Sequence, residues 1–140
     1  MEGIPCQDVE RLTFPAGSFD LCTCTEVFEH VPDDGAGFRE VCRVLASGGR
    51  FLFTVPLLDR HETVERARRE GAGVVHLMDP EYHGDRIRGR GGVLAFRTYG
   101  RDILGRLARA GFASGEVVHV ADPSGLSEGY PVVIGRKGGE

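Results

Sequence analysis

The fold is decided between residues 19 and 56, which read FDLCTCTEVFEHVPDDGAGFREVCRVLASGGRFLFTVP. The first seven of these residues are mostly apolar or β-branched, and a turn-forming Ala16-Gly17-Ser18 precedes them. This pattern predicts a buried strand over residues 19–25. A nearly continuous apolar run over residues 50–56 predicts a second strand, of the kind that a parallel sheet buries on both faces.

A helix is expected between these two strands. Its apolar residues recur along one side, at Phe38, Val41, Cys42, Val44 and Leu45. Asp33 or Asp34 can cap the start of this helix, and Ser47-Gly48-Gly49 is expected to end it. Residues 19–56 therefore predict a strand–helix–strand unit with parallel strands and a right-handed crossover.

The segment from residue 57 to residue 98 is too long for a plain loop, so it needs structure of its own. Residues 60–70 are strongly charged and form a surface helix at best. Two short apolar stretches, 74–78 and 93–96, predict strands. We expect a lid-like hairpin insert over residues 57–98.

The last third of the chain predicts a helix followed by a pair of strands. Apolar residues lie on one side of residues 99–110, and Gly111 is expected to end that helix. Two apolar segments, 115–120 and 130–135, flank a short turn-rich connection and predict an antiparallel hairpin. The expected fold class is α/β, a Rossmann-like, mainly parallel sheet with a C-terminal antiparallel hairpin, in one domain that spans residues 1–140.

Composition and charge narrow the classes of protein to which the chain can belong. The chain has 140 residues, 41% hydrophobic and 27% charged, which is the balance of one soluble globular domain. A net charge of −4 argues against a protein that coats nucleic acid. The chain has no apolar run of membrane-spanning length and no signal peptide at its start. The four cysteines form no C-x-x-C pair, so we expect reduced thiols and a cytoplasmic protein with no nucleic acid or membrane partner.

Four pieces of the chain, in order and at the usual spacing, resemble class I S-adenosylmethionine-dependent methyltransferases, most of all the subgroup that acts on small molecules. They are DVERLTFP at 8–15, SFD at 18–20, EVFEHVPD at 26–33 and RVLASGGR at 43–50. The resemblance implies methyl transfer from S-adenosylmethionine to a small-molecule acceptor. The family's glycine-rich cofactor loop and its ribose-binding acid have no counterpart here, so the resemblance implies an incomplete domain that binds the cofactor weakly or not at all.

The resemblance also assigns cofactor contacts to particular residues. Asp8 matches the acid that accepts a hydrogen bond from the adenine amine, with the neighbouring amide of Val9; the alternative is that Asp8 only caps a turn. Thr25 and Glu26 follow the first strand, where open α/β sheets bind ligands, and would line the methionine part of the cofactor. The alternative for Glu26 is a solvated loop residue.

Catalytic residues are harder to assign, and His30 and His83 are the candidates. His30 belongs to an E-x-x-E-H cluster with Glu26 and Glu29, similar to one in quinone-pathway O-methyltransferases where such residues can hold a divalent metal. Because the cluster is common in relatives without metal, we assign no metal, and His30 is either structural or part of the acceptor site. His83 lies in the expected lid and can act as a general base or simply as a hydrogen-bonded loop residue.

Two further hypotheses remain open, one about three arginines and one about the function of the chain. Arg86, Arg88 and Arg90 could bind an anionic acceptor or RNA, although a solvated flexible loop is the simpler interpretation. The chain could also be a non-catalytic, methyltransferase-like structural or partner-binding subunit. Since the resemblance places the strand at residues 19–25 beside a strand that is absent here, we expect self-association or a partner that supplies the missing half.

Overall fold

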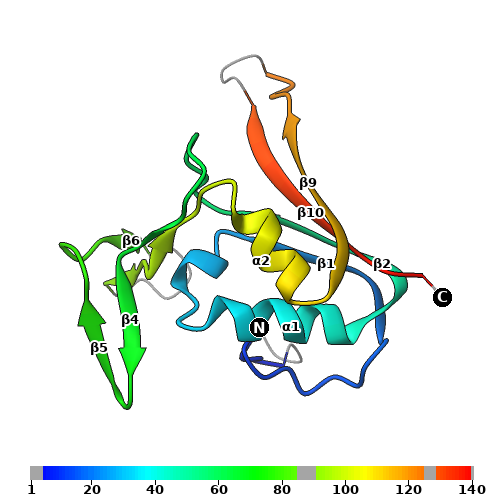
Figure 1. The fold of residues 1–140 in the computed structure, drawn as a ribbon, viewed down its shortest axis with the longest axis horizontal. Helices are drawn as coiled ribbons and strands as arrows, with labels where there is room; N and C mark the ends of the chain where they lie inside the picture. Colours follow the sequence, from blue (N-terminus) through cyan, green and yellow to red (C-terminus); the bar gives the residue numbers. More distant parts are fainter. Residues whose placement is uncertain (1–4, 85–90, 125–128, 140) are drawn as a thin grey trace.

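The computed structural model describes residues 5–84, 91–124 and 129–139 (Figure 1). The main elements are strand β1 (Phe19–Thr25), a 3₁₀ helix η1 (Phe28–His30), helix α1 (Asp34–Val44), strand β2 (Leu45–Thr54), helix α2 (Ile103–Arg109) and strands β9 (Phe112–Val120) and β10 (Tyr130–Lys137). Six short strands lie between β2 and α2: β3 (Val64–Glu65), β4 (Ala67–Glu70), β5 (Gly73–His76), β6 (Tyr82–Gly84), β7 (Gly92–Leu94) and β8 (Arg97–Thr98).

A four-stranded sheet in the order β1-β2-β10-β9 forms the centre of the molecule. β1 and β2 are parallel, whereas β10 runs antiparallel to both β2 and β9. Phe51 and Phe53 are two positions apart on β2, so their side chains point to the same face of the sheet. They are buried in one core with Phe38 of α1 and Leu107 of α2. The α/β fold, the parallel pair around α1 and the C-terminal hairpin are thus confirmed.

The first helix begins as predicted but ends earlier. The Asp33 side chain accepts a hydrogen bond from the Ala36 N–H at 2.9 Å and caps α1. The expected stop at residues 47–49 is wrong, because Leu45 already turns into β2 and pairs with Phe19. The glycines instead shape an irregularity within β2, where Gly48 adopts a φ of +74° and the register with β1 shifts.

The described residues of the 57–98 segment form three small two-stranded ribbons. β3 pairs with β8, β4 with β5 and β6 with β7, all antiparallel. The surface helix expected over residues 60–70 is wrong, because Ala67 is buried while Arg68, Arg69 and Glu70 are exposed and their backbone pairs with β5. Both predicted short strands exist, in β5 and β7, although they pair with different partners rather than with each other.

The second helix is shorter than its apolar pattern indicates. α2 begins at Ile103, because Tyr99 is fully buried and its hydroxyl donates a hydrogen bond to Asp34 at 2.9 Å. Gly100 then packs against the backbone of Glu62 so closely that a Cβ atom would lie 2.5 Å from its carbonyl carbon. Gly111 ends α2 in the left-handed region, at a φ of +104°, as predicted.

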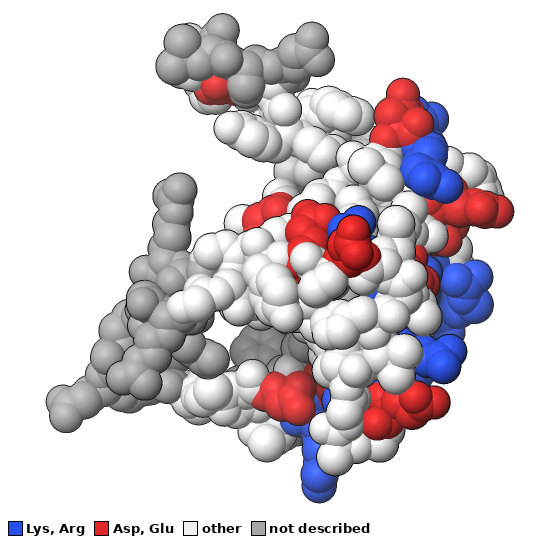
Figure 2. Space-filling model, turned by 90° about the vertical axis from the view of Figure 1, so that its left-hand side faces the viewer, with Lys and Arg blue, Asp and Glu red and all other residues white. Residues whose placement is uncertain are grey.

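The surface carries charges of both signs. On the face that Figure 2 shows, blue Lys and Arg side chains lie among red Asp and Glu side chains along one edge of the molecule. Among the described residues, no helix is both long and apolar enough to cross a membrane.

Candidate functional site

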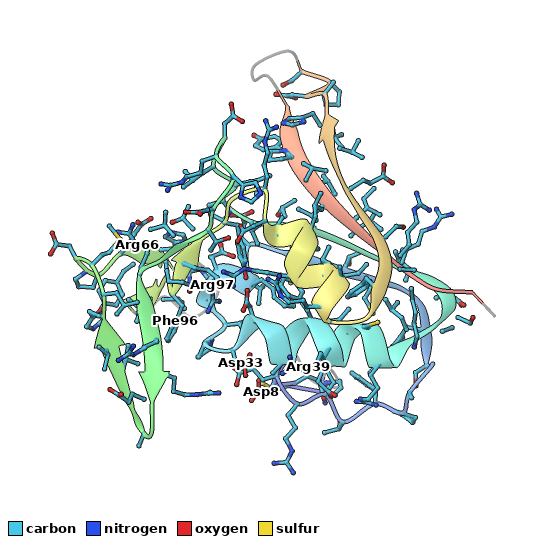
Figure 3. The ribbon with its side chains drawn as sticks, in the orientation of Figure 1. Asp8, Asp33, Arg39, Arg66, Phe96 and Arg97 are labelled. Atoms are coloured by element: carbon cyan, nitrogen blue, oxygen red, sulfur yellow. The ribbon has the colours of Figure 1, made fainter. Side chains whose placement is uncertain are left out.

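A tight turn at Asp8 begins the candidate site. The Asp8 carboxylate accepts a hydrogen bond from the Glu10 N–H at 2.9 Å, and the Arg11 N–H donates to the Asp8 carbonyl at 3.0 Å. Glu10 in turn accepts from the N–H of Asp33, the residue that caps α1, at 2.7 Å. Asp8 therefore does cap a turn, and this turn is fixed beside the start of α1 (Figure 3).

A hollow of about 440 Å³ opens beside this turn. The residues that line it include Asp8, Val9, Val27, His30, Pro32 and Arg69. Arg69 reaches over from β4 and pairs with Glu10 at 2.8 Å, so the 57–98 segment contributes one wall. The two residues that the resemblance assigns to the adenine thus lie in one hollow with the turn that follows β1.

Thr25 and Glu26 line a second hollow of about 520 Å³ on the other side of that turn. It also includes Thr54 and Val55, which lie at the end of β2, and the Glu26 N–H donates to the Thr54 carbonyl at 3.0 Å. The second hollow therefore adjoins the carboxyl ends of the two parallel strands, where α/β sheets bind ligands, and the first is lined by residues that follow β1. The candidate cofactor residues are divided between the two hollows.

Glu26 adopts a left-handed backbone conformation, with a φ of +49°. Among the described residues it is the non-glycine residue with a positive φ, and this conformation costs a residue with a side chain on the order of 1 kcal/mol. Such strained turns often occur at ligand-binding sites. The turn after β1 is therefore a candidate for contact with a ligand.

A cluster of ionisable side chains lies next to the first hollow. η1 presents Glu29 and His30, and β6 brings His83 to them from the 57–98 segment. Glu29 Oε1 lies 3.6 Å from His30 Nε2 and 3.8 Å from His83 Nδ1, and the two imidazole rings meet edge to face at 4.8 Å. Both histidines are candidates from the sequence. Their contact could not be predicted from sequence spacing, because they lie on separate elements.

Burial dominates the electrostatics of this cluster. Glu29 is fully buried, and burial raises its pKa to about 7, with a further contribution from the negative charge of Glu26. Burial lowers the pKa of His30. Glu81 accepts a hydrogen bond from His83 at 3.1 Å, and this bond together with the charge of Arg66 lowers the pKa of the Glu81 carboxyl. The cluster is thus a partly desolvated group of titratable side chains.

No pattern in the sequence predicts the buried arginine that holds η1 in place. Arg97 donates hydrogen bonds to the carbonyl oxygens of Phe28, Val31 and Pro32 and also contacts Glu65 at 3.1 Å (Figure 3). Three backbone carbonyls that follow β1 are therefore satisfied from β8. Arg97 lies in an otherwise unremarkable stretch, so only the fold reveals its role.

Two other predictions about the site concern Glu26 and the three arginines of residues 86–90. The three side chains whose ligand atoms lie within 4.8 Å of one another are Glu29, His30 and His83. Glu26, the third member of the cluster in the sequence, is not one of them. Arg86, Arg88 and Arg90 lie outside the described residues.

Comparison with known proteins agrees with these features. Residues 3–53 match the family described as "Methyltransferase domain". The ubiquinone biosynthesis O-methyltransferase of Coxiella burnetii is 41% identical over 49 residues, which are 35% of this chain and 21% of that protein. The chain therefore spans about a fifth of the length of this curated relative.

Solved structures share the fold over nearly the whole chain. An S-adenosylmethionine-dependent methyltransferase from Mesorhizobium loti aligns with a TM-score of 0.56 at 22% identity, over 93% of this chain and 67% of that one. A 1,6-didemethyltoxoflavin-N1-methyltransferase from Burkholderia thailandensis, solved with S-adenosylhomocysteine, aligns with a TM-score of 0.53 at 16% identity, over 93% and 48% of the two chains.

The fold is α/β and Rossmann-like, as in the solved methyltransferases with which the chain aligns. Residues 3–53 are similar in sequence to a methyltransferase domain, and the chain is similar in fold to solved S-adenosylmethionine-dependent methyltransferases.

Proposed function

We propose that this chain takes part in methyl transfer from S-adenosylmethionine to a small-molecule acceptor. The observation that carries the proposal is that Asp8 and Val9 share a hollow with the turn after β1, at the ligand-binding end of the parallel strands. The Asp8 carboxylate already accepts one hydrogen bond and has lone pairs left for an amine. These residues fit the adenine end of the cofactor, and Thr25 and Glu26 fit the methionine end.

When bound, S-adenosylmethionine supplies the methyl group. The contribution of the protein is to position the acceptor and to exclude water. His30 lines the hollow, and the ring of His83 packs edge to face on that of His30, so these two side chains could take a proton from an acceptor.

The alternative hypothesis is that the chain is a non-catalytic, methyltransferase-like subunit that binds a partner. Methyl transfer requires that the chain binds the cofactor, whereas the alternative does not. We propose that binding is weak, above the micromolar range, because the contacts supplied by a glycine-rich loop have no counterpart in this sequence. Complete absence of binding by the chain at millimolar cofactor would favour the non-catalytic subunit.

The test is cofactor binding by the Asp8→Ala variant, measured by calorimetry at high protein concentration with S-adenosylhomocysteine. Loss of a hydrogen bond to the amine of the cofactor weakens binding by about tenfold. Asp59→Ala is the control, since Asp59 is an exposed carboxylate paired only with the exposed Arg101. Equal affinity of the Asp8→Ala variant and the unchanged chain would contradict the assignment of Asp8.

A further inference from the structure

We propose that Glu29, His30 and His83 form a binding site for a divalent transition-metal ion, and that the 57–98 segment supplies one of its three ligands. One ligand atom from each residue lies within 4.8 Å of the other two. This site shares His30 and His83 with the acceptor side proposed above, but metal binding can be measured without the Asp8 turn or any cofactor.

The hydrogen bonds around the two histidines determine which ring nitrogens can bind a metal. Nδ1 of His30 lies 2.9 Å from the carbonyl oxygen of Leu94, which can only accept, so this nitrogen carries the proton. Nε2 of His83 lies 3.1 Å from a carboxylate oxygen of Glu81 and is protonated for the same reason. The lone pairs of the remaining nitrogens, Nε2 of His30 and Nδ1 of His83, both turn towards Glu29.

This arrangement is the one found around metal-binding histidines. A ligating imidazole usually donates its other N–H to a backbone carbonyl or a carboxylate, which fixes the ring and makes the free nitrogen more basic. His30 uses a carbonyl and His83 uses a carboxylate. The outer contacts of a metal site are therefore already present.

The Glu29 carboxylate provides independent support. Its side chain is fully buried, and neither carboxylate oxygen has a hydrogen-bond partner among the described residues. A buried carboxylate without a partner costs several kcal/mol in general, and proteins rarely leave one so. Three lone-pair atoms thus converge, with the negative charge of Glu26 close by, and a cation satisfies all of them at once.

The distances and the donor set indicate the kind of metal. Ligands at about 2.1 Å around a tetrahedral ion lie about 3.4 Å from one another. The two distances from Glu29, 3.6 and 3.8 Å, are close to that value. Two imidazoles and one carboxylate suit Zn²⁺, Fe²⁺ or Co²⁺ better than Mg²⁺, which prefers oxygen ligands. The side chain of His83 is about one third exposed, which leaves an open side for a fourth ligand.

A metal here would also join two parts of the fold. Glu29 and His30 belong to η1, directly after the first strand, whereas His83 belongs to β6. The ion would therefore hold the β6–β7 ribbon against the end of the central sheet. Metal binding should stabilise the whole chain as well as fill a pocket.

Titration with metal alone tests the proposal. Calorimetry with Zn²⁺, and absorption spectroscopy with Co²⁺ as a coloured probe, are performed on the full chain carrying Cys6→Ser, which removes an exposed thiol that could bind either ion. We expect one ion per chain, a Co²⁺ spectrum of low coordination number, and no displacement by millimolar Mg²⁺. His83→Ala should weaken binding by about tenfold or more and abolish the thermal stabilisation by Zn²⁺.

The matched control is His119→Ala, since His119 lies on β9 outside the cluster. It should bind Zn²⁺ like the unchanged chain. Glu29→Gln keeps the size of the buried side chain and removes its charge, so it should also lose the ion even where it folds normally. Equal Zn²⁺ affinity of the His83→Ala variant and its parent, or no binding by the parent at 100-fold molar excess, would overturn the proposal, whatever the outcome of the cofactor experiment.

Discussion

His30 Nδ1 lies 2.9 Å from the carbonyl oxygen of Leu94, a residue 64 positions further along the chain. Beside this contact, the Phe96 N–H donates to the carbonyl oxygen of Glu29 at 2.7 Å. The turn after β1 and the end of the 57–98 segment are thus joined by two short polar contacts. These contacts place His83 beside His30 and create a cluster that is not visible in the sequence.

Arg97→Gln should destabilise the chain by about 3–5 kcal/mol, because it removes the charge that faces Asp34 and Glu65 and leaves buried carbonyls unsatisfied. Urea denaturation followed by circular dichroism measures the loss. Arg101→Gln is the matched control: its partner Asp59 is exposed, and an exposed ion pair contributes at most about 1 kcal/mol. Similar unfolding midpoints for the two variants would show that Arg97 holds nothing in place.

The glycines of the two helices should respond in opposite directions to alanine. A Cβ atom at Gly37 would lie 2.9 Å from the ring of Phe28, which packs on α1, so Gly37→Ala should cost about 1–3 kcal/mol. A Cβ atom at Gly105 would meet only the end of the Arg109 side chain, at 3.5 Å, so Gly105→Ala should stabilise α2 by up to about 1 kcal/mol. Thermal unfolding of both variants measures this difference. Stabilisation by Gly37→Ala would contradict the close packing of Phe28.

The parts of the fold that the sequence predicted well are those with a strong local signal. The strand at Phe19–Thr25, the Asp33 cap and the final hairpin all depend on residues close together in the chain. The predicted burial of that strand is wrong, because each of its residues is exposed or half-buried at the edge of the sheet. The 57–98 segment was harder, because its charged strands have exposed side chains and are defined by their backbone pairing. A charged stretch such as Ala67–Glu70 carries no periodic signal that separates an exposed strand from an exposed helix.

The same reasoning applies to the candidate site. Asp8, Thr25 and Glu26 could be named from the resemblance, since they lie in recognisable motifs. Arg97 and the pairing of His30 with His83 could not, because each depends on how the 57–98 segment folds back on η1. Long-range contacts of this kind leave no spacing pattern in the chain.

Cysteine reactivity should separate one thiol from the others. Burial, together with the nearby carboxylates of Glu29 and Glu26, raises the pKa of Cys24 to about 12, so this thiol carries almost no thiolate at pH 8. Burial also raises the pKa of Cys22 and Cys42, whereas Cys6 is exposed.

A thiol reagent at pH 8 should therefore modify one cysteine rapidly and the other three only as the chain unfolds. Cys6→Ser should remove the rapid phase. A rapid phase that persists in this variant would mean that a strand cysteine is accessible, and mass spectrometry of the modified peptide would identify it.

The open edge of the central sheet should make the chain associate with itself. Among the described residues, β1 pairs with β2 on one side and with no strand on the other. Leu21 on this strand is 54% exposed, and a groove of about 280 Å³ lined by Phe19 and Cys22 runs beside it. The strand contains no lysine or proline, the residues that usually protect such an edge.

We propose that the strand that covers this edge is β1 of a second copy. The unpaired N–H and C=O groups of an edge accept any extended strand, and two identical edges can pair antiparallel about a two-fold axis. Light scattering should show a mass that rises with protein concentration, and Leu21→Lys should shift the chain towards the monomer. Val74→Lys is the control, because Val74 is similarly exposed but lies on β5. A monodisperse monomer at high micromolar concentration that unfolds cooperatively would refute the pairing, since the chain would then tolerate an exposed apolar edge without a partner.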